Sequence, residues 1–264
     1  IFVKGGRMGR KVYKIQKWAS CSLGIFIFAF FSYDIHSSPI ENNQERFEKV
    51  ALQIWEYAEL GYLEEKSSRL LQQELVNSGF EIQSGIAGIP TAFIAEYNNG
   101  GPIIGVLGEF DALPGLSQQN VPFKNSEGLD SPNGHACGHH LFGAASAWAV
   151  VAIKDWLEET NTPGTIRFYG TPAEEGGSGK VYIARDGYFN DVDIVLHWHP
   201  ASGNSADAQS SNSNKSGKFT FNGISAHAAS APDKGRSALD GVEAMNMMVN
   251  MMREHVPQES RIHY

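Results

Sequence analysis

The side chains with the clearest chemical potential lie at residues 135–140, which read HACGHH. Cysteine and histidine are the ligands that zinc and similar ions prefer in proteins. A Cys-x-His pair just before a helix can direct a sulfur atom and an imidazole ring toward one point. We therefore interpret Cys137 and His139 as candidate metal ligands. A solvated loop that happens to hold three histidines is the alternative.

Two adjacent carboxylates, Glu174 and Glu175, follow an apolar segment at residues 165–170 that we expect to be a strand. Ligand-binding loops of an open α/β sheet gather at the carboxyl ends of its strands. Adjacent carboxylates repel each other unless a cation or a proton separates their roles. The pair therefore indicates a bound cation or a proton held between the two groups. An exposed acidic turn is the alternative, and the glycine-rich and apolar context disfavours it.

Two further polar clusters follow apolar runs. His197 and His199 lie two residues apart after an apolar run, so they face the same side in an extended chain. Glu109 and Asp111 follow the apolar run at residues 103–107. Four clusters of acidic, histidine or cysteine residues at the ends of apolar segments would be improbable by chance. We therefore expect one metal site at one edge of a sheet.

The elements that must position these clusters alternate between strands and helices. Apolar residues at helical spacing predict four helices, at residues 45–60, 68–77, 139–158 and 179–186. Short apolar or alternating runs predict five strands, at residues 80–83, 91–97, 103–107, 165–170 and 193–197. This alternation favours an α/β fold, with a mixed sheet and helices on both of its faces.

The composition changes after Pro200. Residues 201–216 are rich in Ser, Asn, Ala and Gly, which is typical of a connection between domains. We predict one domain at residues 39–202 and a second at residues 203–264. In the second domain we expect strands at 218–221 and 261–264 and a helix at 236–255. Its methionine stripe (Met245, Met248 and Met252) is more typical of packing than of a binding site.

The first 38 residues are basic and then apolar. Six basic side chains precede an apolar run at residues 18–31, and small polar residues follow it. This pattern is typical of a secretory signal peptide, and the run is short for a membrane span. We therefore expect an exported protein that is cleaved between about Ser32 and Ile40. An uncleaved N-terminal membrane anchor is the main alternative.

Charge and cysteine content argue against a nucleic-acid-binding protein and against a disulfide-stabilised fold. The chain has a net charge of −8, and residues 1–38 hold six basic and one acidic side chain. The remaining residues therefore carry 15 basic and 28 acidic side chains, a net charge of −13 that repels the phosphates of nucleic acids. Of the two cysteines, Cys21 lies in the apolar run and Cys137 stands alone, so no disulfide framework is expected.

Five motifs carry a resemblance: FDALP, GHACGHH, TPAEEGG, HWHP and ISAHAASAPDKGRSALD, in that order. They resemble the metal-dependent amidohydrolases and metallopeptidases, a family of aminoacylases, hippurate hydrolases, auxin-conjugate hydrolases and carboxypeptidase G-type enzymes. The resemblance covers roughly residues 43–264. The stretches GTIRFYG, KGRSALD, REH and RIHY are most similar to the branch that holds the B-type subunits of aminobenzoyl-glutamate hydrolase.

The resemblance implies a zinc-peptidase-like catalytic domain and an α+β lid and dimerisation domain. It implies hydrolysis of the amide bond of an N-acyl or aminobenzoyl amino acid with two divalent ions per subunit, zinc or manganese. Cys137 would bridge the ions, His139 would bind one and Glu175 the other. Glu174 would be the general base, and Asp111 would support a ligating histidine.

The resemblance leaves one histidine ligand open. The wider family's H-x-x-P pattern favours His197, whereas the W-H-P pattern of the nearer branch favours His199, which we prefer. His227 resembles a residue that reaches across a dimer to polarise the substrate carbonyl; a surface loop histidine is the alternative. The implied partners are a small N-acyl amino acid or dipeptide-like substrate and a second subunit, either identical or related.

The chain also departs from the family pattern. His140 stands where the family usually has Asp or Asn, and Glu109 stands where many relatives have Asp. Family members continue well past Tyr264 and carry a further histidine ligand there, so we expect a fragment that is inactive and folds poorly alone. A dipeptidase and a non-catalytic metal-binding or receptor protein are the rival functions. Glu174 beside Glu175 argues against the second rival, because a pure binding site needs no base.

Overall fold

The computed structural model describes residues 41–206 and 210–264. The chain forms two compact units, the first ending at Asn204 and the second beginning at Ser205. The segment that we interpret as a signal peptide or anchor, residues 1–38, lies outside the described residues. Among the helices of the described residues, none combines the length and the apolar character needed to cross a membrane.

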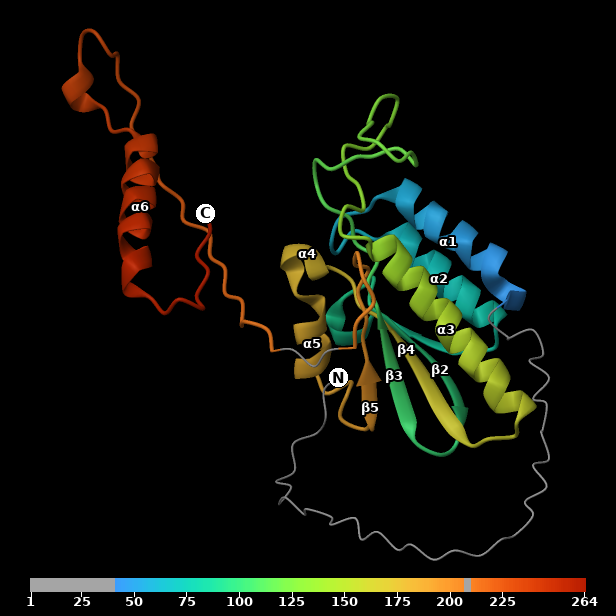
Figure 1. The fold of residues 1–264 in the computed structure, drawn as a ribbon. Helices are drawn as coiled ribbons and strands as arrows, with labels where there is room; N and C mark the ends of the chain where they lie inside the picture. The colour runs from blue at the N-terminus through green and yellow to red at the C-terminus, as the bar shows by residue number, and fades with distance from the viewer. Residues whose placement is uncertain (1–40, 207–209) are drawn as a thin grey trace, which may run out of the picture. The chain divides into compact units, whose positions relative to one another are not determined.

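The first unit is built on a five-stranded sheet with the strand order β1-β2-β4-β3-β5 (Figure 1). The strands are β1 (Glu81–Ser84), β2 (Phe93–Asn99), β3 (Ile103–Gly108), β4 (Gly164–Gly170) and β5 (Ile194–Leu196). β2 pairs antiparallel with β1 and with β4, whereas β3 pairs in parallel with β4 and with β5. The expectation of a mixed α/β sheet is confirmed, and all five predicted strands are present.

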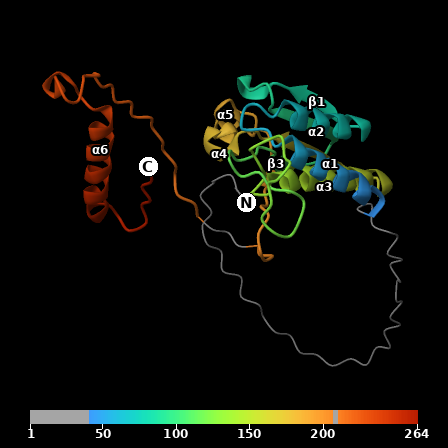
Figure 2. The ribbon, with the colours of Figure 1, turned by 90° about the horizontal axis from the view of Figure 1, so that it is seen from above.

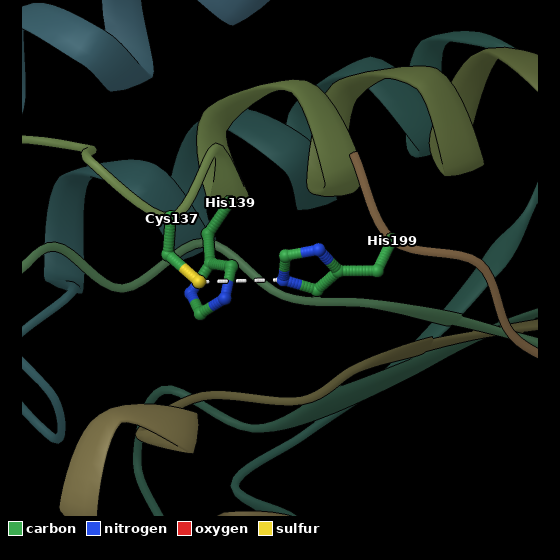
Figure 3. A group of neighbouring side chains, drawn as sticks. All are labelled: Cys137, His139 and His199. Atoms are coloured by element: carbon green, nitrogen blue, oxygen red, sulfur yellow. Dashed lines mark hydrogen bonds between the residues drawn. The ribbon is translucent and has the colours of Figure 1, made fainter. Parts of the chain in front are cut away.

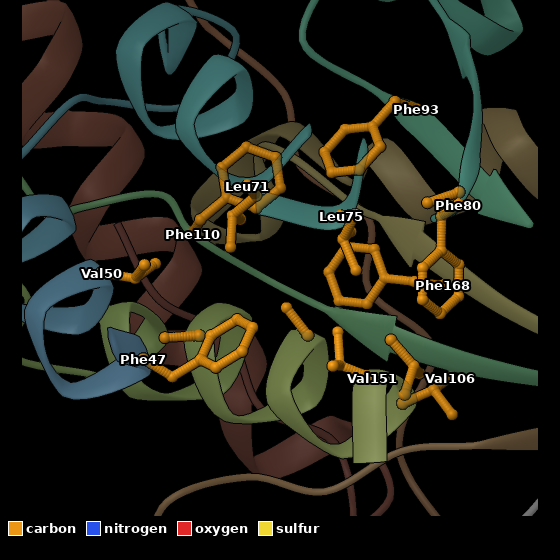
Figure 4. Packing of buried hydrophobic residues seen from close by; sticks show 14 of the residues in the cluster. Phe47, Val50, Leu71, Leu75, Phe80, Phe93, Val106, Phe110, Val151 and Phe168 are labelled. Atoms are coloured by element: carbon orange, nitrogen blue, oxygen red, sulfur yellow. The ribbon is translucent and has the colours of Figure 1, made fainter. Parts of the chain in front are cut away.

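Three helices pack on one face of this sheet, as Figures 1 and 2 show. They are α1 (Gln44–Tyr57), preceded by the short η1 (Glu41–Asn43), α2 (Glu65–Asn77) and α3 (His139–Glu159). In α1 the helical spacing of Phe47, Val50 and Ile54 places them in one buried stripe. They pack with Phe168 of β4 and other apolar residues in the main core (Figure 4).

The opposite face of the sheet is covered by shorter elements. They are η2 (Ile86–Gly88) and α5 (Gly179–Arg185), and the single turn α4 (Glu174–Gly177) directly precedes α5 in the chain. A second buried cluster joins Ile86 of η2 and Ile183 of α5 to Leu107 and Tyr169 on the strands. Helices therefore lie on both faces of the sheet, as expected.

The parallel pairing of β3, β4 and β5 fixes where the polar clusters gather. Parallel strands end at the same edge of a sheet, and we call this edge, at Gly108, Gly170 and Leu196, the carboxyl edge. The residues that follow each strand include Glu109, Glu174 and His197. The topology therefore brings together side chains that lie up to 88 residues apart in sequence.

The second unit contains one long helix, α6 (Ala238–Met252), flanked by η3 (Pro232–Lys234) and η4 (Arg253–His255). Ser237 caps α6, because its Oγ accepts a hydrogen bond from the Asp240 amide at 3.1 Å. The strands predicted at residues 218–221 and 261–264 are wrong: these residues form no strand, and the described part of the unit holds one isolated bridge, between Ile224 and Arg236. An extended segment is a strand only where a neighbour pairs with it.

Candidate metal centre

Cys137 and His139 enter the site through a turn at the start of α3. Gly138 between them is the N-cap of the helix and has φ 82°, a left-handed conformation that glycine adopts most easily. This turn lets α3 begin at His139, two residues after Cys137. Further along α3, a Cβ atom on Gly143 would lie 2.6 Å from the Glu109 carbonyl oxygen. Glycine therefore allows α3 to approach the carboxyl edge closely.

Three predicted ligands converge beside this turn: Cys137, His139 and His199 (Figure 3). The Cys137 Sγ atom lies 3.3 Å from Nε2 of His199. One ligand atom from each of the three side chains lies within 4.8 Å of the others. One sulfur and two imidazole nitrogens form a set that suits zinc and similar ions.

Asp111 orients two of the predicted site residues. Its Oδ1 atom lies 2.9 Å from Nδ1 of His139, and its Oδ2 atom accepts a hydrogen bond from the Glu175 amide at 2.8 Å. Because Asp111 occupies Nδ1, the free nitrogen of His139 is Nε2. A carboxylate behind a histidine is a common arrangement at metal sites, where it fixes the ring and raises its basicity.

Three glutamates surround the free nitrogen of His139. From Nε2, the Glu109 Oε2 atom lies at 2.9 Å, the Glu174 Oε2 atom at 3.9 Å and the Glu175 Oε1 atom at 4.0 Å. Glu109, His139 and Glu174 form a second group whose ligand atoms all lie within 4.8 Å of one another. The carboxyl edge therefore presents a sulfur- and nitrogen-rich group beside an oxygen-rich one, and His139 belongs to both.

The crowding of acids shifts the titration of their neighbours. Burial alone would lower the pKa of His139, but the carboxylates of Asp111 and Glu109 raise it to about 10. Burial together with Glu175 raises the pKa of Cys137 to about 12. Burial and the charge of Glu109 also raise the pKa of Glu174. The site thus favours added positive charge, whether from protons or from metal ions.

The residues present fit a bound cation. Glu109 Oε2, His139 Nε2 and Glu175 Oε1 are buried and have no hydrogen-bond partner among the described residues. Buried polar atoms without partners cost free energy, and native proteins nearly always satisfy them. The Glu109 and Glu175 oxygen atoms lie 2.9 Å and 4.0 Å from His139 Nε2, so cations bound beside this nitrogen would give all three atoms a partner.

Two of the predicted site residues, His197 and His227, do not belong to either group of candidate ligands among the described residues. His197 is 41% exposed, its Nε2 atom lies 3.7 Å from Glu109 Oε1, and it belongs to neither ligand group among the described residues. His227 lies in the second unit, where its Nδ1 atom accepts hydrogen bonds from the amides of Ala229 and Ser230 at 3.2 Å each. Of the two histidines that the sequence left open, His199 is the one beside Cys137.

Sequence reasoning missed Glu64, which holds the turn before the paired glutamates. Its carboxylate is fully buried; Oε1 accepts a hydrogen bond from the Ala173 amide at 2.8 Å, and Oε2 accepts one from Thr91 Oγ1 at 3.1 Å. Ala173 has φ 57° and directly precedes Glu174. Burial raises the pKa of Glu64 to about 7. No local pattern could have indicated this contact, which spans 109 residues.

Comparison with known proteins places this geometry in a family. The sequence profile of peptidase family M20/M25/M40 matches residues 105–237. The chain is 42% identical over 232 residues to the B-type subunit of p-aminobenzoyl-glutamate hydrolase of Escherichia coli strain K12, covering 88% of this chain and 48% of that protein. It is 30% identical over 241 residues to the human Xaa-Arg dipeptidase, covering 85% and 51%. The chain thus spans about half the length of these curated relatives.

A solved structure agrees with the sequence matches. The YXEP protein of Bacillus subtilis, described as a dinuclear metal binding peptidase from the M20 family, has a TM-score of 0.53 at 26% identity. The match covers 61% of this chain and 44% of that one. The profile match spans half of the chain and includes the carboxyl edge with its cysteine, histidines and glutamates. The resemblance carried by the five motifs is thereby confirmed, and the chain belongs to peptidase family M20/M25/M40.

Proposed function

We propose that the protein hydrolyses the amide bond of an N-acyl or aminobenzoyl amino acid, such as aminobenzoyl-glutamate, with two divalent ions at the carboxyl edge. The observation that carries this proposal is the set of buried, unpartnered ligand atoms on Glu109, His139 and Glu175 beside the Cys137–His199 pair. The substrate class comes from the name of the Escherichia coli relative, a p-aminobenzoyl-glutamate hydrolase.

The candidate ligands can be assigned to two ions. Cys137, His139 and His199 would hold one ion, and Cys137 with Glu175 would hold the other. Thiolate and imidazole favour zinc, whereas additional carboxylates make manganese suitable as well. Such ions, when bound, polarise the substrate carbonyl as Lewis acids and lower the pKa of water, so that a nucleophilic hydroxide is available at neutral pH.

Glu174 is the proposed general base. Its side chain is 46% exposed, and Oε2 lies 3.9 Å from His139 Nε2. The carboxylate is therefore close to the site but is not held by a short contact with His139. It takes a proton from the attacking water as the water oxygen bonds to the amide carbon. It then gives that proton to the nitrogen as the carbon–nitrogen bond breaks. Asp111 keeps His139 oriented throughout by holding Nδ1.

Two further parts of the proposal concern assembly. His227 polarises the substrate carbonyl in the site of a neighbouring protomer, a role that the family resemblance suggests. The neighbour is either a second copy of this chain or a related protein; the name of the Escherichia coli relative, which designates one subunit of its enzyme, supports the latter. Size measurement of the purified protein, alone and co-expressed with a related protein, tests this part. A strictly monomeric active enzyme would contradict it.

We also propose that residues 1–38 direct export. Six basic side chains before the apolar run at residues 18–31 support this proposal. Mass spectrometry of the N-terminus of the protein from its own cells checks it. An intact N-terminus that retains Lys11 on a cytoplasmic protein would contradict it.

The central experiment combines metal analysis with a substrate panel. The full-length protein should retain about two zinc or manganese ions per subunit and release aminobenzoate from aminobenzoyl-glutamate. N-acyl amino acids and dipeptides ending in arginine belong in the panel, because the human relative is an Xaa-Arg dipeptidase. Faster cleavage of the dipeptides would favour that second function. Absence of both metal and hydrolysis would overturn the proposal.

A further inference from the structure

The carboxylate of Glu109 is buried at the end of β3, and its two oxygens have different surroundings. Glu109 is only 2% exposed. Its Oε1 atom forms an ion pair with Lys180 of α5 and lies 3.7 Å from His197 Nε2. Its Oε2 atom has no assigned hydrogen bond but lies 2.9 Å from His139 Nε2, an ion-pair distance if that ring is protonated. One oxygen is therefore held by the fold, and the other points at the candidate metal centre.

An ion pair alone does not account for this arrangement. A buried carboxylate is costly unless its charge and its lone pairs are both compensated. Lys180 compensates Oε1, but Oε2 remains without a hydrogen bond in a buried position. The position of Oε2, 2.9 Å from His139 Nε2, is compensated either by a proton on that nitrogen or by a cation that takes the proton's place.

His139 presents a matching unpartnered atom on the other side. Its Nδ1 atom is held by Asp111, and its Nε2 atom, which faces Glu109, has no hydrogen-bond partner among the described residues. Glu109, His139 and Glu174 each offer a ligand atom within 4.8 Å of the other two. An imidazole nitrogen and carboxylate oxygens can bind one divalent ion together.

Building on the proposed metal-dependent function, we propose that Glu109 is a ligand of the ion that His139 binds, through Oε2. Lys180 is a positioning residue that holds Oε1 and so aims Oε2 at the ion. The centre then has a carboxylate ligand from the end of β3 in addition to the sulfur and imidazole ligands. An added oxygen ligand favours harder ions, so Glu109 should increase the affinity for manganese more than that for zinc.

The test uses Mn²⁺ and Zn²⁺ alone as probes, bound to the metal-stripped full-length protein and followed by calorimetry. We expect Glu109→Gln to weaken Mn²⁺ binding by at least about tenfold and Zn²⁺ binding by less. Lys180→Met, which keeps the Glu109 carboxylate, should weaken Mn²⁺ binding less than Glu109→Gln does. Glu159→Gln, at the exposed end of α3, is the matched control and should bind both ions like the wild type.

The double variant Glu109→Gln/Lys180→Met separates a ligand from a structural ion pair. It removes both buried charges, so a purely structural pair predicts restored metal binding, whereas a lost ligand predicts that Mn²⁺ binding stays weak. Glu109→Asp preserves the charge but retracts the oxygen by one methylene, and it should also bind Mn²⁺ weakly. Circular dichroism checks that each variant folds. If Glu109→Gln does not fold, Mn²⁺ binding by Glu109→Asp and by the double variant still distinguishes a metal ligand from a structural ion pair.

The two proposals fail in different ways. If the wild-type protein binds no divalent ion, the proposed metal-dependent function is wrong. If the wild type binds two ions and folded Glu109→Gln and Glu109→Asp bind Mn²⁺ with unchanged affinity, then the role of Glu109 is wrong and the proposed function stands. Wild-type affinity in the double variant would also overturn the ligand role.

Discussion

Glu174 and Glu175 are neighbours in sequence but have different surroundings. The Glu174 side chain is 46% exposed, whereas Glu175 is 20% exposed with a buried, unpartnered Oε1 atom. The backbone explains the difference, because Glu175 leaves helical geometry at ψ 75° and its amide donates to Asp111. A partly buried carboxylate with one buried oxygen suits a ligand, and a more exposed one suits a group that must exchange protons.

This difference predicts different failures for the two amide variants. Glu174→Gln should keep both ions but lose turnover by about two to four orders of magnitude, because the amide cannot accept the proton. Glu175→Gln should lose metal as well as activity. Metal content and kcat measured on the same samples check both outcomes. Near-normal kcat in Glu174→Gln, or full metal content in Glu175→Gln, would show that the roles are misassigned.

The two strand-end histidines are separated by one residue but approach different partners. His199 Nε2 lies 3.3 Å from Cys137 Sγ, and His197 Nε2 lies 3.7 Å from Glu109 Oε1. We therefore expect His199→Ala to weaken Zn²⁺ binding strongly, by about 100-fold or more, and His197→Ala to weaken it less. Zn²⁺ titration of both variants checks this order. The reverse order would restore His197 as the ligand.

At the scale of elements, the approach of α3 to β3 depends on Gly143. An added Cβ would lie 2.6 Å from the Glu109 carbonyl oxygen, so Gly143→Ala must push the helix away from the carboxyl edge. We expect a loss of about 1–3 kcal/mol in the free energy of unfolding and weaker metal binding. Denaturant unfolding and metal titration measure the two effects. Ala149→Gly, on the exposed side of the same helix, should cost about 1 kcal/mol and leave metal binding unchanged.

The turn between β4 and α4 depends on a buried acid, and this makes stability depend on pH. Burial raises the pKa of Glu64 from 4.5 to about 7. The folded state then binds the proton more tightly than the unfolded state, so the Glu64 contribution to stability is present below about pH 4.5 and is lost as pH rises to about 7. The loss is at most about 3 kcal/mol.

Glu64→Gln isolates this contribution, because the amide keeps an oxygen that can accept the Ala173 hydrogen bond but cannot ionise. Relative to the wild type, the variant should gain stability as pH rises from about 4.5 to about 7. Urea unfolding across that range checks the sign. Glu65→Gln, at the exposed neighbouring position, is the control and should show no such relative gain. A constant difference between Glu64→Gln and wild type would contradict the prediction.

The elements were predictable because their signals are local, whereas several contacts at the site were not. Apolar runs predicted all five strands of the first unit, and the rule that ligands gather at strand ends predicted the carboxyl edge. The role proposed for Glu109 could not be predicted from sequence, because it rests on contacts with Lys180 and His139 that form only in the tertiary structure. The strands predicted at residues 218–221 and 261–264 failed for the same reason, since pairing is not a local property.

At the scale of the whole molecule, part of the acidic charge lies where a cation would be bound. The chain has a net charge of −8, and four carboxylates, of Glu109, Asp111, Glu174 and Glu175, lie around His139. The Asp111 and Glu109 carboxylates overcome the effect of burial and raise the pKa of His139 to about 10, so without metal the ring carries a proton at neutral pH. This single proton compensates less charge than divalent ions would.

Metal removal should therefore destabilise the first unit selectively, because both groups of candidate ligands among the described residues belong to it. Ions held at about 1,000 times their dissociation constant contribute about 4 kcal/mol to folding. For a unit of this size, that corresponds to a fall in Tm on the order of 10 °C after treatment with a chelator. Calorimetry with and without chelator, followed by re-addition of Mn²⁺ or Zn²⁺, measures the change.

Glu175→Gln provides the control for this experiment. It should melt between the untreated and the chelated wild type and respond less to chelator than the wild type does, because one of its two ion sites is already lost. The transition of the second unit, where a separate one is observed, should not move, since its described residues contribute no member to either ligand group. Identical melting of the wild type before and after verified removal of its metal would show that the buried carboxylates are compensated by protons alone, and that the ions do not stabilise the fold.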